Sequence, residues 1–192
     1  MAETGTLHDA FIDELRDMYD AEKQLTKALP KLAKAAVDAK LRTAFENHLQ
    51  ETQGQIARLE QVFESLDEKA RGKHCDGMAG IIEEGKAIME EDFDETTMDA
   101  CLIAAGQRAE HYEMASYGTL VAWAEAMGHT EAARLLQESL EEEKAADRKL
   151  SGLAEGGINQ GAADLAHPAE DDEPAGAAAS STRGSSARGA RR

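Results

Sequence analysis

Four stretches of this chain carry apolar side chains at alternating intervals of four and three residues. They run over about residues 7–37, 41–66, 97–127 and 130–153. This spacing is typical of a helix that buries one face against other helices. Aromatic residues make up only 4% of the chain, while alanine, leucine, glutamate and lysine are abundant. This composition favours helices and excludes a β-sandwich.

The lengths of the connections predict how these helices are arranged. Only a few residues separate the first stretch from the second and the third from the fourth, so each pair should form an antiparallel hairpin. About 30 residues separate the second from the third, with a shorter helical stretch over 78–90. A connection of that length suits a crossover. We therefore predict an all-α, ferritin-like four-helix bundle with one long crossover that carries an extra short helix.

The ends of the last two helices also carry local signals. Gly128 is suited to stop the third helix, and Thr130 is suited to cap the start of the fourth.

The composition changes near Gly156, which divides the chain into two parts. Residues 156–192 are rich in glycine, alanine, serine and arginine and contain almost no large apolar side chain. Such a segment cannot bury enough surface to offset its loss of conformational entropy. We predict a helical bundle over 1–155 and a disordered tail over 156–192.

The net charge of −17 limits the partners of this protein. Acidic and basic residues nearly cancel in the tail, so residues 1–155 carry −16 of that charge. A bundle this acidic opposes binding to nucleic acid and attracts cations. Four arginines lie among the last ten residues of the tail, which leaves open either a contact with an anionic surface or a merely solubilising role.

Membrane and secretory features are missing from the pattern. No apolar run reaches about 18 residues, and the N-terminal residues do not resemble a signal peptide. Cys75 and Cys101 lack the spacing of a disulfide framework or a C-x-x-C motif. We expect a soluble, cytoplasmic protein without a membrane partner.

Carboxylates interrupt the apolar pattern at the middle of three predicted helices. Glu22 takes an inward position in the first stretch, and Glu110 and Glu113 take consecutive inward positions in the third. Glu143 and Asp147 take consecutive inward positions in the fourth stretch. The second stretch turns polar at the same level, with an imidazole on the inward face and a carboxylate at its flank. The full set of candidate metal ligands is Glu22, His48, Glu51, Glu110, Glu113, Glu143 and Asp147.

Carboxylates gathered inside a bundle must be neutralised. An isolated buried carboxylate costs several kcal/mol, and neighbouring ones repel each other as well. Either protonation or bound cations can remove this cost. Oxygen ligands with one imidazole suit iron or manganese. The alternatives are that single acids such as Glu22 reach water at the helix flank, and that His48 is an ordinary core histidine.

Several segments resemble the YciE/YciF family of bacterial ferritin-like proteins. They are residues 13–25, 45–59, 110–120 and 140–144, which include Tyr19-Asp20-Ala21-Glu22 and Glu110-His111-Tyr112-Glu113. The resemblance covers nearly all of 6–155. It implies a ferritin-like bundle with an extra helix, a homodimer, a role in stress responses and ferroxidase activity.

The resemblance also implies a set of metal ligands, and the chain departs from the general ferritin pattern in part of it. The implied ligands are Glu22, Glu51 with His48, Glu110, Glu113 and Glu143. Ferritin-like bundles build di-metal sites with a Glu-x-x-His motif on two helices. Here Gly54 follows Glu51 and Ala146 follows Glu143 at the position of that histidine.

Three functions are compatible with this sequence. The first is an enzyme with a di-iron or di-manganese centre that oxidises Fe²⁺ with O₂ or peroxide. The second is a module that binds divalent metal ions without redox turnover. The third is a metal-free structural or interaction bundle, whose stability would not respond to a chelator.

Overall fold

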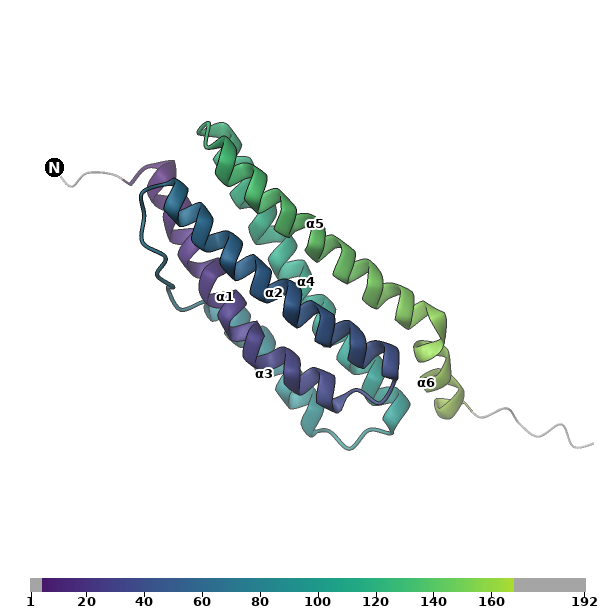
Figure 1. Ribbon diagram of the computed structural model, residues 1–192. Helices are drawn as coiled ribbons and strands as arrows, with labels where there is room; N and C mark the ends of the chain where they lie inside the picture. The colour runs from purple at the N-terminus through teal and green to yellow at the C-terminus, as the bar shows by residue number, and fades with distance from the viewer. Residues whose placement is uncertain (1–4, 168–192) are drawn as a thin grey trace, which may run out of the picture.

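The computed structural model describes residues 5–167, and all of their regular structure is helical (Figure 1). Four long helices form an elongated bundle, with a shorter helix along one side and a short one at the C-terminal end of the bundle. The helices are α1 (Leu7–Ala35), α2 (Ala39–Ser65), α3 (Asp76–Glu90), α4 (Glu95–Ala126), α5 (Thr130–Leu153) and α6 (Asn159–Ala166), with a π-helical turn η1 (Ala154–Ile158) between α5 and α6.

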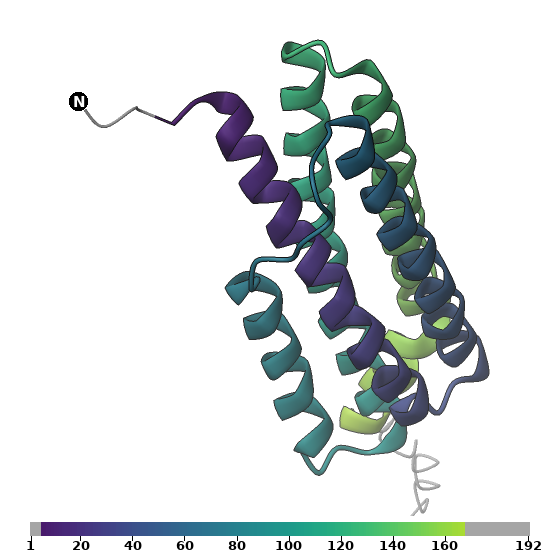
Figure 2. The same ribbon diagram turned by 60° about the vertical axis from the view of Figure 1, so that its left-hand side comes forward.

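The helix order confirms the predicted bundle with one long crossover. Helix α1 packs against α2, and α4 packs against α5, while α2–α5 and α1–α4 contacts close the bundle. The segment between α2 and α4 contains α3, which lies beside α1 and α4 (Figure 2). This connection returns the chain to the end of the bundle at which α2 begins, so that α4 runs parallel to α2.

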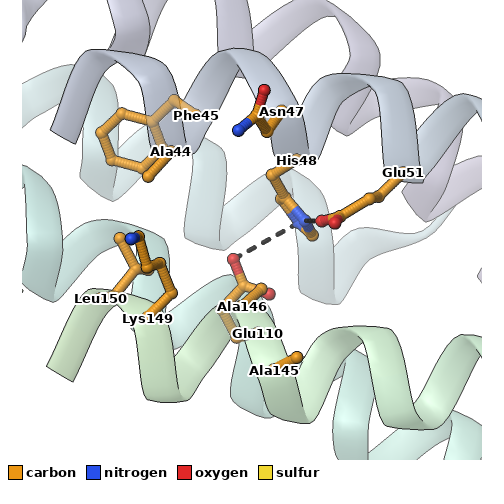
Figure 3. Close-up of a pocket in the computed structure, with 10 residues that line it drawn as sticks. All are labelled: Ala44, Phe45, Asn47, His48, Glu51, Glu110, Ala145, Ala146, Lys149 and Leu150. Carbon is orange, nitrogen blue, oxygen red and sulfur yellow. Dashed lines mark hydrogen bonds and ion pairs between the residues drawn. The ribbon is translucent and has the colours of Figure 1, made fainter. Parts of the chain in front are cut away.

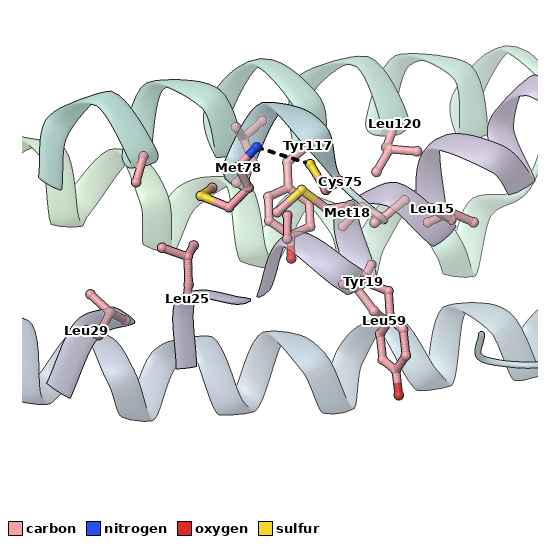
Figure 4. Packing of buried hydrophobic residues seen from close by; sticks show 14 of the residues in the cluster. Leu15, Met18, Tyr19, Leu25, Leu29, Leu59, Cys75, Met78, Tyr117 and Leu120 are labelled. Atoms are coloured by element: carbon pink, nitrogen blue, oxygen red, sulfur yellow. Dashed lines mark hydrogen bonds between the residues drawn. The ribbon is translucent and has the colours of Figure 1, made fainter. Parts of the chain in front are cut away.

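Apolar side chains fill the bundle on both sides of its middle. Figure 4 shows Leu15, Met18 and Leu120 packed together, with Leu25 and Leu29 further along α1. These residues are almost completely buried. They are the residues of the four-and-three spacing, so the predicted inward face is the face that the structure buries.

Capping side chains set where three of the helices begin. Thr6 and Asp9 form a reciprocal capping box at the start of α1. Asp38 accepts hydrogen bonds from two backbone N–H groups at the start of α2, and Asp94 does the same for α4. These side chains satisfy backbone donors that the first helical turn leaves free.

The turn between α4 and α5 confirms one predicted helix end and corrects the other. Gly128 has φ +76° and ends α4, as expected of a residue in the left-handed region. His129 N–H donates to Ala124 O over 2.8 Å, which completes a Schellman turn. The predicted cap at Thr130 is wrong. His129 completes the turn and also takes the cap position of α5, so Thr130 is already helical.

The turn between α1 and α2 is held by a buried carboxylate from α4. Asp99 accepts hydrogen bonds from the backbone N–H groups of Val37 (2.8 Å) and Asp38 (2.7 Å). It is only 4% exposed. Asp99 therefore ties the short first connection to the start of the second hairpin.

The C-terminal part of the chain begins differently from the prediction. The composition predicts disorder from residue 156 onward, but the chain turns at a kink at Gly157 (φ +132°) and continues as the helix α6 (Asn159–Ala166), which lies against α4. A Cβ placed on Gly161 would lie 3.0 Å from Thr96 Cγ2, so the absence of a side chain at Gly161 allows α6 to approach α4 closely. The rest of the predicted tail, 168–192 with its four arginines, lies outside the described residues.

Within residues 5–167, no helix has both the length and the hydropathy needed to cross a membrane.

Candidate metal centre

Polar side chains from all four long helices meet at the middle of the bundle. The acidic ones are Glu22 from α1, Glu110 and Glu113 from α4, and Glu143 from α5; α2 contributes His48. All five are buried. The alternative in which Glu22 reaches water is thus excluded, because this side chain is 0% exposed.

Four of these residues are arranged closely enough to share a metal ion. His48, Glu110, Glu113 and Glu143 each offer one ligand atom, and these four atoms all lie within 4.8 Å of one another. Three carboxylate oxygens with one imidazole nitrogen form the donor set expected for iron or manganese.

The His48 ring is oriented by a carboxylate outside the group. Its Nδ1 lies 3.3 Å from Glu51 Oε2, and Figure 3 shows both side chains at the side of the bundle. Its Nε2 lies 3.3 Å from Glu110 Oε1 and 3.7 Å from Glu143 Oε2. If Nδ1 carries the proton and donates it to Glu51, the lone pair of Nε2 faces the two carboxylates. This is the usual arrangement of a metal-binding histidine.

Glu22 is held by a buried tyrosine of α4. The Tyr117 hydroxyl donates a hydrogen bond to Glu22 Oε1, and both residues are completely buried. Burial first, and then the Glu22 carboxylate, raise the pKa of Tyr117 well above its ordinary value, so its proton stays on the phenol. The other carboxylate oxygen, Glu22 Oε2, has no hydrogen-bond partner.

Gln55 of α2 belongs to the same cluster, although the sequence did not mark it as a functional residue. Its Nε2 donates to Glu143 Oε1 and, over 3.2 Å, to Glu142 Oε2. Arg58 binds Glu142 through two hydrogen bonds of 2.7 and 3.0 Å. The two carboxylates fix the amide orientation, because only its N–H₂ group can donate to them. The Gln55 oxygen is left buried without a partner.

The six residues Glu22, His48, Gln55, Glu110, Glu113 and Glu143 are called the central cluster below. Burial is the largest cause that raises the pKa of Glu22, Glu110 and Glu113 well above 4.5, and the Glu143 carboxylate is the next. Burial also raises the pKa of Glu143, against the opposing effect of His48. These directions describe carboxylates without a cation, and a bound cation would reverse them.

The unpaired atoms of the central cluster fit a cation. Among residues 5–167, eight buried side-chain nitrogen or oxygen atoms lack a hydrogen-bond partner, and seven of them belong to this cluster. Both oxygens of Glu113 are among them. Buried polar atoms without partners are rare in proteins and call for an explanation. A metal ion would bind these unpaired acceptor atoms and would neutralise the carboxylates, whose pKa values are raised in its absence.

Three predicted ligands lie outside the four-residue group. Glu22 is still part of the central cluster, whereas Glu51 and Asp147 are not. The Glu51 side chain is 47% exposed and contacts His48 from outside. Asp147 Oδ1 lies 3.2 Å from His111 Nε2 and accepts a hydrogen bond from Gln107 over 3.1 Å. Both residues lie about one turn from a cluster residue but at the edge of the helix face, where partners other than a metal ion satisfy them.

A four-helix bundle with one long crossover and a central carboxylate–histidine cluster defines a ferritin-like protein. The family described as "Domain of unknown function (DUF892)" matches residues 6–163, and this chain belongs to that family. Over 156 residues the chain is 51% identical to protein YciF of Escherichia coli strain K12, covering 81% of this chain and 94% of YciF. This finding confirms the resemblance to the YciE/YciF family.

Solved structures agree with this assignment. The crystal structure of the E. coli stress protein YciF matches with a TM-score of 0.79 and 51% identity, covering 82% of this chain and 99% of YciF. YcfI from Rhodopseudomonas palustris, which has been proposed to be a structural protein, matches with a TM-score of 0.76 and 45% identity, covering 78% and 96%. A Xanthomonas campestris protein that is 22% identical shares the fold, with a TM-score of 0.61 and coverage of 84% and 96%.

Proposed function

We propose that this protein binds two divalent iron or manganese ions in its central cluster, as part of a bacterial stress response. One observation carries the proposal: seven buried polar atoms without hydrogen-bond partners converge between four helices. The stress role is supported by the 51% identity to YciF, which is described as a stress protein.

The charge of the cluster supports two ions rather than one. Glu22, Glu110, Glu113 and Glu143 carry four negative charges when ionised, and a neutral His48 and Gln55 add none. Two divalent cations would neutralise the cluster, whereas one would leave two buried negative charges. Bundles of this class hold metal pairs in the same place.

The proposed reaction is the oxidation of Fe²⁺ by O₂ or peroxide. Bound iron would supply the electron transfer to the oxidant. The chain supplies the carboxylates that hold the ions, the Glu51 contact that orients His48, and the Tyr117 hydroxyl that binds Glu22. The apolar layers on either side of the cluster limit access of water along the bundle.

A metal-free structural role is the second candidate, favoured by the description of the relative YcfI. In that case the carboxylates would be protonated, as their raised pKa values allow. A chelator would then leave the melting temperature unchanged, whereas it lowers the melting temperature of a metal-bound protein.

Metal content distinguishes these functions. Protein purified without chelator or nickel resin and loaded anaerobically with Fe²⁺ or Mn²⁺ should retain about two ions per chain by plasma mass spectrometry. A Glu110→Gln/Glu113→Gln variant should lose them, because it removes two ligands at nearly constant side-chain volume. Glu125→Gln/Glu141→Gln is the matched control, since both carboxylates are exposed on α4 and α5. Equal metal content in both variants would contradict the proposed site.

The resemblance implies a homodimer, and the sequence features predict a cytoplasmic location. These remain predictions, which light scattering and cell fractionation can test. The sequence predicts a bundle over 1–155 and a tail over 156–192. We propose that the folded body instead extends through α6 and that the tail begins after it.

A further inference from the structure

A pocket in the side of the bundle leads to one edge of the central cluster. It lies between α2 and α5 and has a volume of about 210 Å³ (Figure 3). His48 and Glu110 line it together with the buried side chains of Phe45 and Leu150. Asn47, Glu51 and Lys149 also line it and are exposed, so the pocket extends from the surface to the cluster.

Within residues 5–167, the pocket coincides with the only part of the central cluster that retains any solvent exposure. His48 is 4% exposed and Glu110 is 2% exposed, and both line the pocket. The other four members of the cluster, Glu22, Gln55, Glu113 and Glu143, are each 0% exposed. Within the described residues, a solvent molecule or ion therefore meets the cluster first at His48 and Glu110.

Three alanines keep this pocket open. Ala44 of α2 and Ala145 and Ala146 of α5 line it, and Figure 3 shows Ala146 next to Glu110 and Ala44 next to Phe45. Their side chains end at Cβ, so any longer apolar side chain on the inner side would project into the pocket. Ala146 is half-buried and Ala145 is exposed, so Ala146 lies deeper in the pocket than Ala145.

We propose that this pocket is the route by which a hydrated divalent cation reaches the central cluster and leaves it. The inference rests on the proposed metal binding and adds the path and the first contacts of the ion. A volume of about 210 Å³ holds several water molecules, as a partly hydrated ion requires. His48 Nε2 and Glu110 Oε2 have no hydrogen-bond partner and are the first atoms able to replace those waters.

Narrowing the route separates the rate of binding from its strength. Ala146→Leu should slow the association of Mn²⁺ at least tenfold and slow its release to a chelator by the same factor. The dissociation constant should stay within about twofold, because a barrier on the path leaves both end states unchanged. Ala145→Leu repeats the test closer to the surface. Ala57→Leu is the control, since Ala57 is exposed on α2 and does not line the pocket.

The experiment follows the electron paramagnetic resonance signal of free Mn²⁺ after rapid mixing with the full chain, and after chelator is added to the loaded protein. Circular dichroism and equilibrium Mn²⁺ content check that each variant is folded and complete. Slow rates with unchanged content in either pocket variant support the route. Wild-type rates in both pocket variants overturn it while metal binding stands. No Mn²⁺ bound by the wild type would overturn the proposed function itself.

Discussion

Gln55 sits where a carboxylate would give the central cluster a fifth negative charge. Its side-chain amide instead donates hydrogen bonds to Glu143 and Glu142. Arg58 also donates to Glu142 and so fixes the position of that carboxylate. The Gln55 oxygen is buried and has no hydrogen-bond partner. Gln55 is therefore suited to contribute a neutral oxygen ligand and to position Glu143 at the same time.

Replacing Gln55 by leucine tests both effects at similar side-chain volume. Gln55→Leu should weaken Mn²⁺ binding about tenfold, the lower end of the loss found when a group that orients a metal ligand is removed. Calorimetric titration gives the dissociation constant. Gln53→Leu is the control, because Gln53 is exposed on the same helix. Equal Mn²⁺ affinities in the two variants would show that Gln55 neither binds the metal ion nor positions Glu143.

Asp99 acts at the scale of whole elements, because it joins the α1–α2 turn to the N-terminal part of α4. Two backbone N–H groups of a three-residue connection donate to its carboxylate. Short connections leave few ways to satisfy their own backbone donors. Asp99 satisfies two at once and links the two hairpins at that end of the bundle.

Removing this carboxylate should loosen the connection. Asp99→Ala should lower the free energy of unfolding by about 2 kcal/mol, since hydrogen bonds to charged acceptors contribute about 1.5–3 kcal/mol each and the freed N–H groups regain some water. Urea unfolding followed by circular dichroism measures the change. Asp92→Ala should have almost no effect, because Asp92 is exposed. If Asp99→Ala lowers the free energy of unfolding no more than Asp92→Ala does, the α1–α2 turn keeps its shape without Asp99.

At the scale of the whole molecule, the buried carboxylates link stability to pH. Their pKa values are raised in the folded protein, so between pH 4.5 and those raised values the folded state binds more protons than the unfolded state. Stability of the metal-free protein then decreases as pH rises through this range. Below pH 4.5 both states are protonated and the effect ends.

The unfolding free energy of chelator-treated protein should therefore be higher at pH 6 than at pH 8. The slope is about 1.4 kcal/mol per pH unit for each extra proton bound. Mn²⁺ should reverse the trend, because it competes with protons for the same oxygens. Glu22→Gln/Glu113→Gln should flatten the slope. Metal-free protein that gains stability from pH 6 to pH 8 would contradict the assigned directions.

Most of the fold could be predicted from the spacing of apolar residues, because this spacing determines directly which face of each helix is buried. The predicted stretches end within two residues of α1, α2, α4 and α5, and the inward acids Glu22, Glu110 and Glu113 are buried. Spacing alone cannot distinguish the centre of an inward helix face from its edge. For this reason the predicted metal ligands include Glu51 and Asp147, which lie at the edge. The link from Arg58 to Glu142 joins residues 84 positions apart, so no local pattern contains it.

The central cluster fastens four helices together at one level, and this has a consequence for how long the protein persists. Without cations, the buried carboxylates must either take up protons or repel one another, and this free-energy cost at the midpoint of the bundle favours brief separation of the helices there. Proteases and hydrogen exchange act on such openings. On the proposed function, the supply of divalent metal would set the lifetime of the protein in the cell, so its abundance would follow metal availability even at constant synthesis.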